Sequence, residues 1–500
     1  MTLEHRQPPE PSAHTALKTL LNSLDPLSVS QHLAFYELYE ETPEGKQALL
    51  RAWKLLGGDE KNPGEKAKNL PKVDIQALIS LVTRQPSDPV IELTLEQLEF
   101  VEEMGKHLGN RKLKGHSIWE KEAAITISNE ETDLARSLLL FQFDEEKNKI
   151  RQYEASLDLM ALQIQARLKE SSTHEEKIKE INRFIFQEMQ FRFPPHSLYA
   201  ADIDLYTFLP SVLDSRQGVC LGVSILYLSL AQRLNLPLEI ITPPGHIYVR
   251  YNDRKTLINI ETTARGVDLP SELYLGINTR SLQQRTLKQV IGLAFMNQAS
   301  VFWSKGDHIK TVALYEKALP FMKQDPSLKL FLGFNLIFTG NEEEGTKLLE
   351  GVRLLTLPEA VSQETLADDY LAGRVNAEGV KAIFLPVDET RASIVKKQQE
   401  LETLVKAYPF YRAGLLQLAT TWLQLGRTSE AQEVLMRYHK IDSTSSIVEY
   451  YLTALCLERL DYTQAWQHLT RTEALLQARN HRPKVLFSIK ETLLRICPEP

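Results

Sequence analysis

The chain has 500 residues, more than the roughly 250 to 300 at which a single hydrophobic core stops growing, so we expect two or three domains. Hydrophobic residues make up 43% and charged residues 25%, which is typical of a globular protein, and the net charge is only -7. This balance gives no indication of nucleic-acid or membrane binding.

The first residues and the cysteines indicate the expected cellular compartment. The first residues show no basic stretch followed by an apolar run, and no segment approaches the roughly 18 consecutive apolar residues of a membrane span. Cys220, Cys456 and Cys497 are too scattered for a disulfide framework and match no zinc-site spacing. We therefore expect a cytoplasmic protein with reduced thiols, no metal and no cofactor.

Residues 1–129 predict a helical N-terminal region. Apolar runs such as "KQALLRAWKLLGG" and "LEQLEFVEEMGKHLG" have helical spacing, and breakers such as "KNPGEKAKNLP" separate them. Nothing in these residues indicates a particular type of helical domain.

Residues 130–285 predict a domain that mixes helices and strands. Apolar residues from Ile150 to Leu168 form one stripe of a long helix, and Thr173 with Glu176 predicts a capping box for the next. The segment from Leu221 to Leu234 is apolar on nearly every side, as in a helix buried all round. The runs "PLEIITP", "HIYVRYN" and "KTLINIETT" then predict three successive antiparallel strands.

Residues 286–500 show internal repetition. "FWSKGDHIKTVALYEKAL" and "LIFTGNEEEGTKLLEGV" align through Gly306 and Gly340, 34 residues apart, and two later segments align through Ala431 and Ala465 at the same period. Residues 353–405 keep a helical composition but lose this register. The period resembles that of tetratricopeptide repeats, so we expect an α-solenoid built from helical hairpins.

A candidate catalytic site centres on Cys220 within "SRQGVCLGVSILYLSLAQRL". A cysteine nucleophile needs a stabilised thiolate, a base to hold its proton and a group to orient that base. A helix start offers the first, and Gly218 lets the chain turn into the helix. His246 opens the second predicted strand segment and Glu261 closes the third. If these two strands pair antiparallel, the base and the carboxylate lie close together.

Several neighbours keep alternative interpretations open. Asn259 shares a strand face with Glu261 and is an alternative orienting group for His246. Tyr248 and Arg250 share a face with His246 and are candidates for the cleft, although a sheet surface needs polar residues in any case. Gln217 is a candidate oxyanion donor beside the Cys220 amide. Cys456 lies in a repeat helix, where we expect it in the core.

The segments "RQGVCLGVSILYLSLAQRLNLPLEI", "PPGHIYVRY" and "LINIETT" resemble the transglutaminase-like superfamily, which is related to the papain-like fold. In detail they resemble its SirB-type branch, often joined to tetratricopeptide repeats. The resemblance covers about residues 130–285 and implies Cys220 as nucleophile, His246 as base and Glu261 as the orienting acid. The superfamily usually has aspartate at the position of Glu261, and many SirB-type members have proline at that of Cys220.

Together these observations predict a multidomain, mostly α-helical chain with a central α+β transglutaminase-like domain. Two functions remain open. The first is a cysteine hydrolase or acyl transferase that acts on amide groups of a protein or peptide recruited by the repeats. The second is a catalytically inactive transglutaminase-like scaffold whose repeats bind a protein partner.

Overall fold

The computed structural model describes residues 13–56, 58, 77–78, 81, 86–144, 146–194, 206–387 and 390–498. The chain divides into two compact units. The first comprises residues 1–192, 213–216 and 225–237, and the second comprises residues 193–212, 217–224 and 238–500. Among the described residues, no helix combines the length and the apolar character needed to cross a bilayer.

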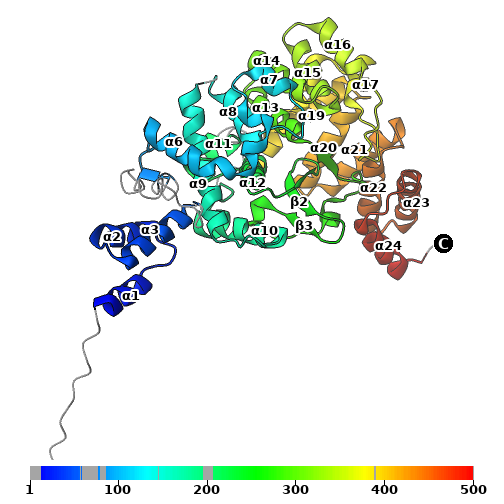
Figure 1. Cartoon of the computed structure of the whole chain (residues 1–500). Helices are drawn as coiled ribbons and strands as arrows, with labels where there is room; N and C mark the ends of the chain where they lie inside the picture. Colours follow the sequence, from blue (N-terminus) through cyan, green and yellow to red (C-terminus); the bar gives the residue numbers. More distant parts are fainter. Residues whose placement is uncertain are drawn as a thin grey trace, which may run out of the picture. The chain divides into compact units, whose positions relative to one another are not determined.

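The first unit is helical in its described part (Figure 1). Thr173 and Glu176 form the predicted capping box at the start of α10. The apolar positions that follow, including Ile178, Ile181 and Ile185, are buried. Its helices are α1 (Ala13–Ser23), α2 (Val29–Leu38), α3 (Pro43–Leu55), α6 (Leu95–Met104), α7 (Lys121–Thr126), α8 (Leu134–Gln142), α9 (Lys147–Ala166) and α10 (His174–Asn182), which a π-helical segment, Arg183–Glu188, continues.

Helix α12 (Cys220–Arg233) is buried on all sides, as its sequence predicts. Within the first unit its last residue, Arg233, donates from Nε to Asp158 Oδ1 at 2.7 Å, and neither side chain is exposed. Tyr227 Oη donates to Asn182 Oδ1 of α10 at 2.9 Å. These buried polar contacts fix the rotation of α12 about its axis, because removing one partner would leave a buried charge or hydroxyl unpaired. A short helix, α11 (Leu209–Ser215), precedes α12.

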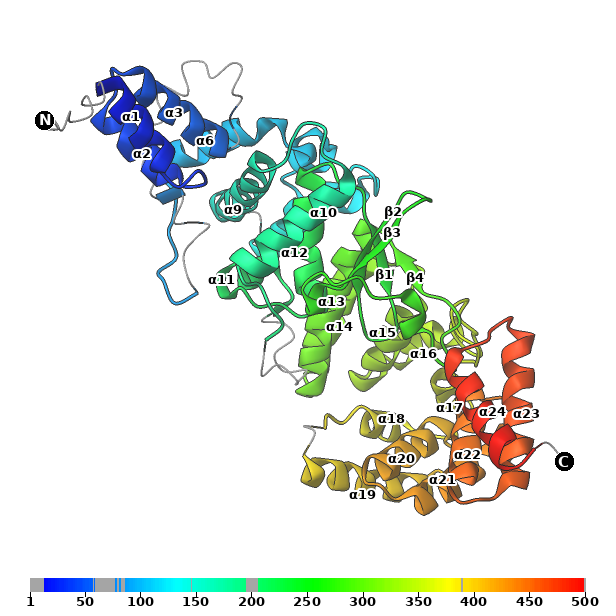
Figure 2. The same cartoon turned by 90° about the horizontal axis from the view of Figure 1, so that it is seen from below.

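The second unit contains an antiparallel sheet with the strand order β3-β2-β1-β4. The three predicted strands are present as β1 (Glu239–Thr242), β2 (Tyr248–Asn252) and β3 (Leu257–Ile260). Their register pairs Ile240 with Val249 and Arg250 with Asn259. The sequence did not predict β4 (Gln283–Arg285), which pairs with β1 at the edge opposite β3 (Figure 2).

Helical hairpins confirm the predicted repeats. In each turn one residue has a positive φ: Gly306, Gly340, Gly426 or Leu460. The next amide then donates at 2.9 Å to the carbonyl oxygen five residues earlier. Ala431 and Ala465, which set the period, are fully buried. The hairpins are α13 (Leu287–Ser304) with α14 (His308–Ala318), α15 (Pro326–Phe338) with α16 (Glu342–Glu350), α20 (Arg412–Gln424) with α21 (Thr428–Ile441), and α22 (Ser446–Glu458) with α23 (Tyr462–Ala478).

The middle of the repeat region keeps more of the pattern than its sequence predicts. Helices α17 (Leu366–Leu371) and α18 (Ala377–Ile383) form a shortened hairpin around Gly373, whose φ is +67°. The amide of Arg374 donates to the Asp369 carbonyl at 2.8 Å, the same hydrogen bond as in the longer hairpins. Helix α19 (Arg391–Ala407) follows, and α24 (Lys484–Ile496) is the last helix of the described residues.

Candidate active site

Cys220 is the first residue of α12 and is half-buried. The approach to the helix differs from the prediction for Gly218. The residue with left-handed backbone geometry is Arg216, with a φ of +52°, and Gly218 is needed for space instead. A Cβ atom on Gly218 would lie 2.7 Å from Val223 Cγ2, and one on Gly222 would lie 2.0 Å from the carbonyl oxygen of Tyr206. Two glycines thus allow close packing around the first turn of the helix.

His246 lies in the turn that leads into β2, two residues before the strand. Its amide donates to the carbonyl oxygen of Pro243 at 3.1 Å, and Gly245 adopts a φ of +69° that suits glycine. The turn fixes the backbone of His246 while the imidazole remains partly exposed, at 23%.

Glu261 follows β3 directly and is 3% exposed. Its Oε2 accepts a hydrogen bond from His246 Nε2 at 2.7 Å. Its Oε1 accepts two bonds from Thr263, one from the amide at 3.2 Å and one from the hydroxyl at 2.7 Å. Both carboxylate oxygens therefore have fixed partners, which holds the plane of the carboxylate against the imidazole ring.

The charges of this pair reinforce each other. Burial alone would raise the pKa of Glu261, but hydrogen bonds from His246, Tyr274 and Thr263 outweigh it and lower the pKa to about 2. Burial alone would lower the pKa of His246, but hydrogen bonds with Cys220 and Glu261 outweigh it and raise the pKa to about 9. At neutral pH the imidazole is thus held as a cation between a carboxylate and a thiol. Because Nε2 bonds Glu261, the other ring nitrogen, Nδ1, is the one available to the thiol.

A second link joins the same strand end to the start of α12. Thr262 Oγ1 donates to the Cys220 carbonyl oxygen at 3.4 Å and lies 3.1 Å from Ser224 Oγ. Thr262 and Ser224 are both buried. Adjacent residues thus fix both halves of the site: Glu261 holds the imidazole and Thr262 holds the backbone of Cys220. The sequence carried no signal for this role of Thr262.

Residues 151–274 match the family model described as the transglutaminase-like superfamily, a range that includes Cys220, His246 and Glu261. The chain contains a transglutaminase-like domain. The match describes the superfamily as a whole, so the assignment to the SirB-type branch stays a prediction.

Several solved structures are similar to parts of the chain. A mutant of MamA is 18% identical, with 37% of this chain and 96% of that chain covered and a TM-score of 0.19. A TPR protein of Thermus thermophilus is 17% identical, with 41% and 100% covered and a TM-score of 0.20. The APC/C Cut9-Hcn1 assembly is 14% identical, with 93% and 76% covered and a TM-score of 0.21. With TM-scores this low, the likeness supports no conclusion about activity or partners. Among curated proteins, none matches the chain.

The alternative site residues of the transglutaminase-like domain form a separate network. Asn259 Oδ1 accepts a bond from Arg250 Nε at 2.8 Å, and Asn259 Nδ2 donates to the Leu269 carbonyl oxygen at 2.6 Å. Arg250 Nη2 donates to Tyr248 Oη at 2.8 Å and to Ser271 Oγ at 2.7 Å. Among the described residues, none of the Asn259 contacts reaches His246. The network attaches the segment around Ser271 to the sheet.

Gln217 lies three residues before Cys220 and is half-buried. Tyr248, a candidate for the cleft, is only 1% exposed and stacks on Tyr274 with ring centroids 5.1 Å apart. Tyr248 thus packs against Tyr274, and Gln217 stays a candidate for the oxyanion site.

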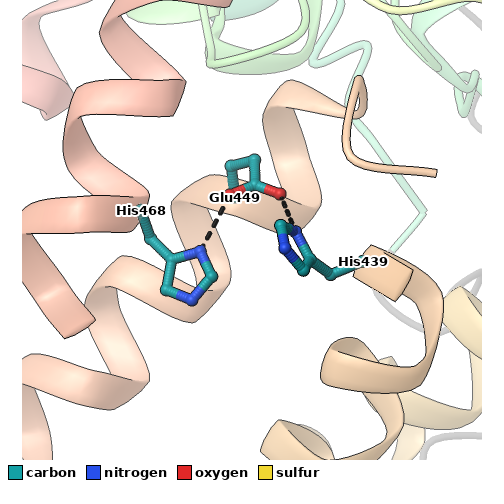
Figure 3. Close-up of side chains that lie close together, drawn as sticks. All are labelled: His439, Glu449 and His468. Atoms are coloured by element: carbon teal, nitrogen blue, oxygen red, sulfur yellow. Dashed lines mark hydrogen bonds and ion pairs between the residues drawn. The ribbon is translucent and has the colours of Figure 1, made fainter. Parts of the chain in front are cut away.

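One group of potential metal ligands lies in the repeats of the same unit, far along the chain from Cys220. Figure 3 shows the Glu449 carboxylate between the imidazoles of His439 and His468. The three side chains come from three successive helices, α21, α22 and α23. His439 Nδ1 lies 2.5 Å from one oxygen and His468 Nδ1 lies 2.8 Å from the other. Burial would raise the pKa of Glu449, but the bonds from both imidazoles outweigh it and lower the pKa.

The Arg471 guanidinium contacts His439 Nε2, the ring nitrogen that does not bond Glu449. This contact determines which nitrogen of His439 carries the proton. Arg471 Nη1 lies 2.8 Å from His439 Nε2, and a guanidinium can only donate. His439 Nε2 must then accept, so Nδ1 carries the proton and donates it to Glu449. A metal ion bound at Nδ1 would displace that proton to Nε2. The protonated Nε2 would then face the Arg471 guanidinium, which is also a donor. The donor set therefore fits a hydrogen-bonded link between three helices better than a metal centre.

The second such group, His116, Asp133 and Glu154 of the first unit, has the same character. His116 Nε2 lies 2.7 Å from Arg111 Nη1, and Arg136 contacts Glu154 with two nitrogens, at 2.7 and 2.5 Å. The Arg136 side chain thus already neutralises Glu154, and Asp133 has His116 Nδ1 and Asn110 Nδ2 as partners, each at 3.1 Å.

Proposed function

We propose that the chain is a cysteine-dependent hydrolase or acyl transferase that acts on amide groups of a protein or peptide recruited by the repeats. Cys220 would be the nucleophile, His246 the acid and base, and Glu261 the group that orients the imidazole. The observation that carries this proposal is the position of one imidazole between a carboxylate, 2.7 Å from Nε2, and the thiol at the start of α12.

In the proposed acylation step, the Cys220 thiolate attacks the amide carbonyl carbon, a C–S bond forms and the carbonyl oxygen takes up the electron pair. The Cys220 backbone amide is the proposed first oxyanion donor, and Gln217 is a candidate second donor. When the tetrahedral intermediate collapses, the C–N bond breaks, and the leaving amine takes the proton from the His246 imidazolium. A thioester on Cys220 remains, and His246 is neutral.

In the proposed second step, His246 takes a proton from water or from an amine that attacks the thioester. The C–S bond then breaks, and the thiolate and imidazolium are restored. Water as acceptor gives peptidase or deamidase activity, whereas an amine gives transamidation. The choice depends on the acceptor that reaches the thioester, so both outcomes belong to the proposal.

An activated ester tests the acylation step without knowledge of the substrate. We expect p-nitrophenyl acetate to acetylate Cys220 of the full chain, detected by peptide mass spectrometry, and Cys220→Ala to abolish this product. Cys497 serves as an internal control, because it is also a half-buried free thiol but has no histidine partner among the described residues. Equal, slow acetylation of Cys220 and Cys497 would refute the enzyme proposal and leave the second candidate.

That second candidate is an inactive transglutaminase-like scaffold with protein-binding repeats. The helical hairpins of the second unit support a binding role, since stacked hairpins of this kind present extended surfaces to peptides. For either function we propose the cytoplasm as the compartment, because the free thiols of Cys220, Cys456 and Cys497 suit a reducing environment.

A further inference from the structure

Tyr274 lies at the end of a 3-10 turn, Ser271–Tyr274, and touches both members of the His246–Glu261 pair. Its hydroxyl donates to Glu261 Oε2, the same oxygen that accepts from His246 Nε2. Its ring stacks on the His246 imidazole with centroids 5.7 Å apart and planes 23° apart. Burial first, and then the bond to Glu261, raise the pKa of the Tyr274 hydroxyl, so it remains a donor across the physiological range.

These contacts constrain the site in two ways. Thr263 already holds Glu261 Oε1, so Tyr274 completes the fixation of the carboxylate by holding Oε2. The stacked ring limits rotation of the imidazole about its Cβ–Cγ bond, because rotation would break a face-to-face contact. The Tyr248 ring also stacks on the Tyr274 ring, with ring planes 21° apart, and so supports its position.

The segment after Tyr274 is attached to the repeats. The Gly276 carbonyl oxygen accepts from His481 Nε2 at 2.7 Å, and His481 lies between α23 and α24. Arg280 donates from its amide to the Glu359 carbonyl oxygen at 2.8 Å and from Nη1 to the Arg479 carbonyl oxygen at 2.7 Å. We name residues 275–280 the strap. It joins the active-site tyrosine to two loops of the repeat region.

We infer that Tyr274 is a positioning residue that sets the alignment of Glu261 and His246, and that the strap makes this alignment depend on the repeats. The inference rests on the proposed function, because alignment matters only if His246 serves Cys220. It adds to that function a route by which a partner bound to the repeats would change the reactivity of the site.

The first test measures the pKa of His246 by NMR titration of histidine-labelled full-length protein, with His246→Gln to assign the signal. Tyr274→Phe keeps the stacked ring and removes only the hydroxyl. If Tyr274 positions Glu261, the pKa of His246 falls by about one unit, a tenfold change in its protonation equilibrium. If Tyr274 merely competes with His246 for Oε2, removing it strengthens the remaining bond, and the pKa rises. A rise or no change would overturn the inference.

Matched variants separate positioning from general destabilisation. Tyr251→Phe removes another hydroxyl of the same sheet, one that donates to Asp253 at 3.1 Å and not to Glu261. We expect it to leave the His246 titration unchanged. Tyr274→Ala should lower the pKa of His246 further than Tyr274→Phe, because it also removes the stacked ring. An equal effect of both substitutions would contradict the role of the ring.

The second test concerns the strap. His481→Ala removes the donor to Gly276, and we expect the pKa of His246 to fall in the same direction as in Tyr274→Phe, by roughly half as much. His107→Ala is the control, since His107 is an exposed histidine of the first unit. An unchanged His246 titration in His481→Ala would disprove coupling to the repeats. These titrations do not require catalysis, so a fall in the pKa together with an unreactive Cys220 would refute the proposed function and leave the positioning role intact.

Discussion

Glu261 has a longer side chain than the aspartate usual at this position in the resembled superfamily, and the structure shows how its length is used. From the end of β3 it reaches His246 with one oxygen and Thr263 with the other. Glu261 acts on the imidazole through this hydrogen bond and through its negative charge. Glu261→Gln removes the charge and keeps the shape of the side chain.

We predict that Glu261→Gln slows alkylation of Cys220 by roughly tenfold at neutral pH, as expected for a loss of about one pKa unit in the support of the imidazolium. Iodoacetamide labelling of Cys220, read by peptide mass spectrometry, measures this. Glu239→Gln in β1 is the matched control, because Glu239 lies on the same sheet and has Asn252 and Arg250 as partners instead of His246. Equal labelling rates of Cys220 in the two variants would show that Glu261 does not act on the site.

The same substitution has a signature in stability against pH. His246 has a pKa raised from 6.5 to about 9, so its contribution is complete below pH 6.5 and is lost as the pH rises through 9. Glu261 has a pKa lowered from 4.5 to about 2, so its contribution is complete above pH 4.5 and is lost as the pH falls through 2. The difference in thermal stability between the native chain and Glu261→Gln should therefore be largest between about pH 4.5 and 6.5. A difference that does not vary with pH would contradict the charged pair.

At this scale the sequence predicted the residue types but not all of their neighbours. Cys220, His246 and Glu261 stand out because they lie at or beside the ends of predicted elements: Cys220 begins α12, whereas His246 lies two residues before β2 and Glu261 directly after β3, not inside the strands as predicted. Tyr274 and Thr262 do not, because their contacts depend on how a turn folds back over the sheet, and no periodicity records that. Gly218 was recognised, but the need for space beside Val223 depends on packing that a sequence pattern does not describe.

Among the elements, the repeat turns share one backbone geometry and differ in how well their residues suit it. Gly306, Gly340 and Gly426 adopt positive φ without strain, whereas Leu460 adopts a φ of +63° at the equivalent place. Leu460 is 69% exposed, so its side chain adds little packing.

We predict that Leu460→Gly stabilises the second unit by about 1 kcal/mol, because relief of the left-handed strain outweighs the entropy that glycine adds to the unfolded chain. Chemical denaturation measures this. Ile309→Gly is the control: Ile309 is 76% exposed and lies in the first turn of helix α14, where glycine relieves no strain and should cost up to about 1 kcal/mol. Destabilisation in both variants would show that the turn at Leu460 is not strained.

The sequence predicted the elements that belong to a long repeat period and missed elements that are short. The 34-residue period identified the hairpins on either side of the middle. Helices α17 and α18 have only six and seven residues, too few to show a repeat register. Strand β4 has three polar residues, Gln283–Arg285, without alternation, and it exists because β1 offers it an edge.

At the scale of the whole molecule, the candidate site and the repeats belong to the same compact unit. The proposed domain boundary at residues 285 and 286 therefore falls inside that unit, between β4 and α13. The sequence predicted domains from composition and period, but the contacts of the strap with His481 and Arg479 join segments about 200 residues apart. No local pattern predicts contacts at such a separation.

The measurement that tests the central claim most directly is the pH dependence of Cys220 alkylation by iodoacetamide in the full-length chain and in His246→Ala, with Cys497 as internal reference. We predict rapid labelling of Cys220 near neutral pH in the native chain and labelling at least about tenfold slower in His246→Ala, because the imidazolium that stabilises the thiolate is lost. Cys497 should react equally in both. Slow and identical labelling of Cys220 in the two proteins would contradict an activated cysteine–histidine pair.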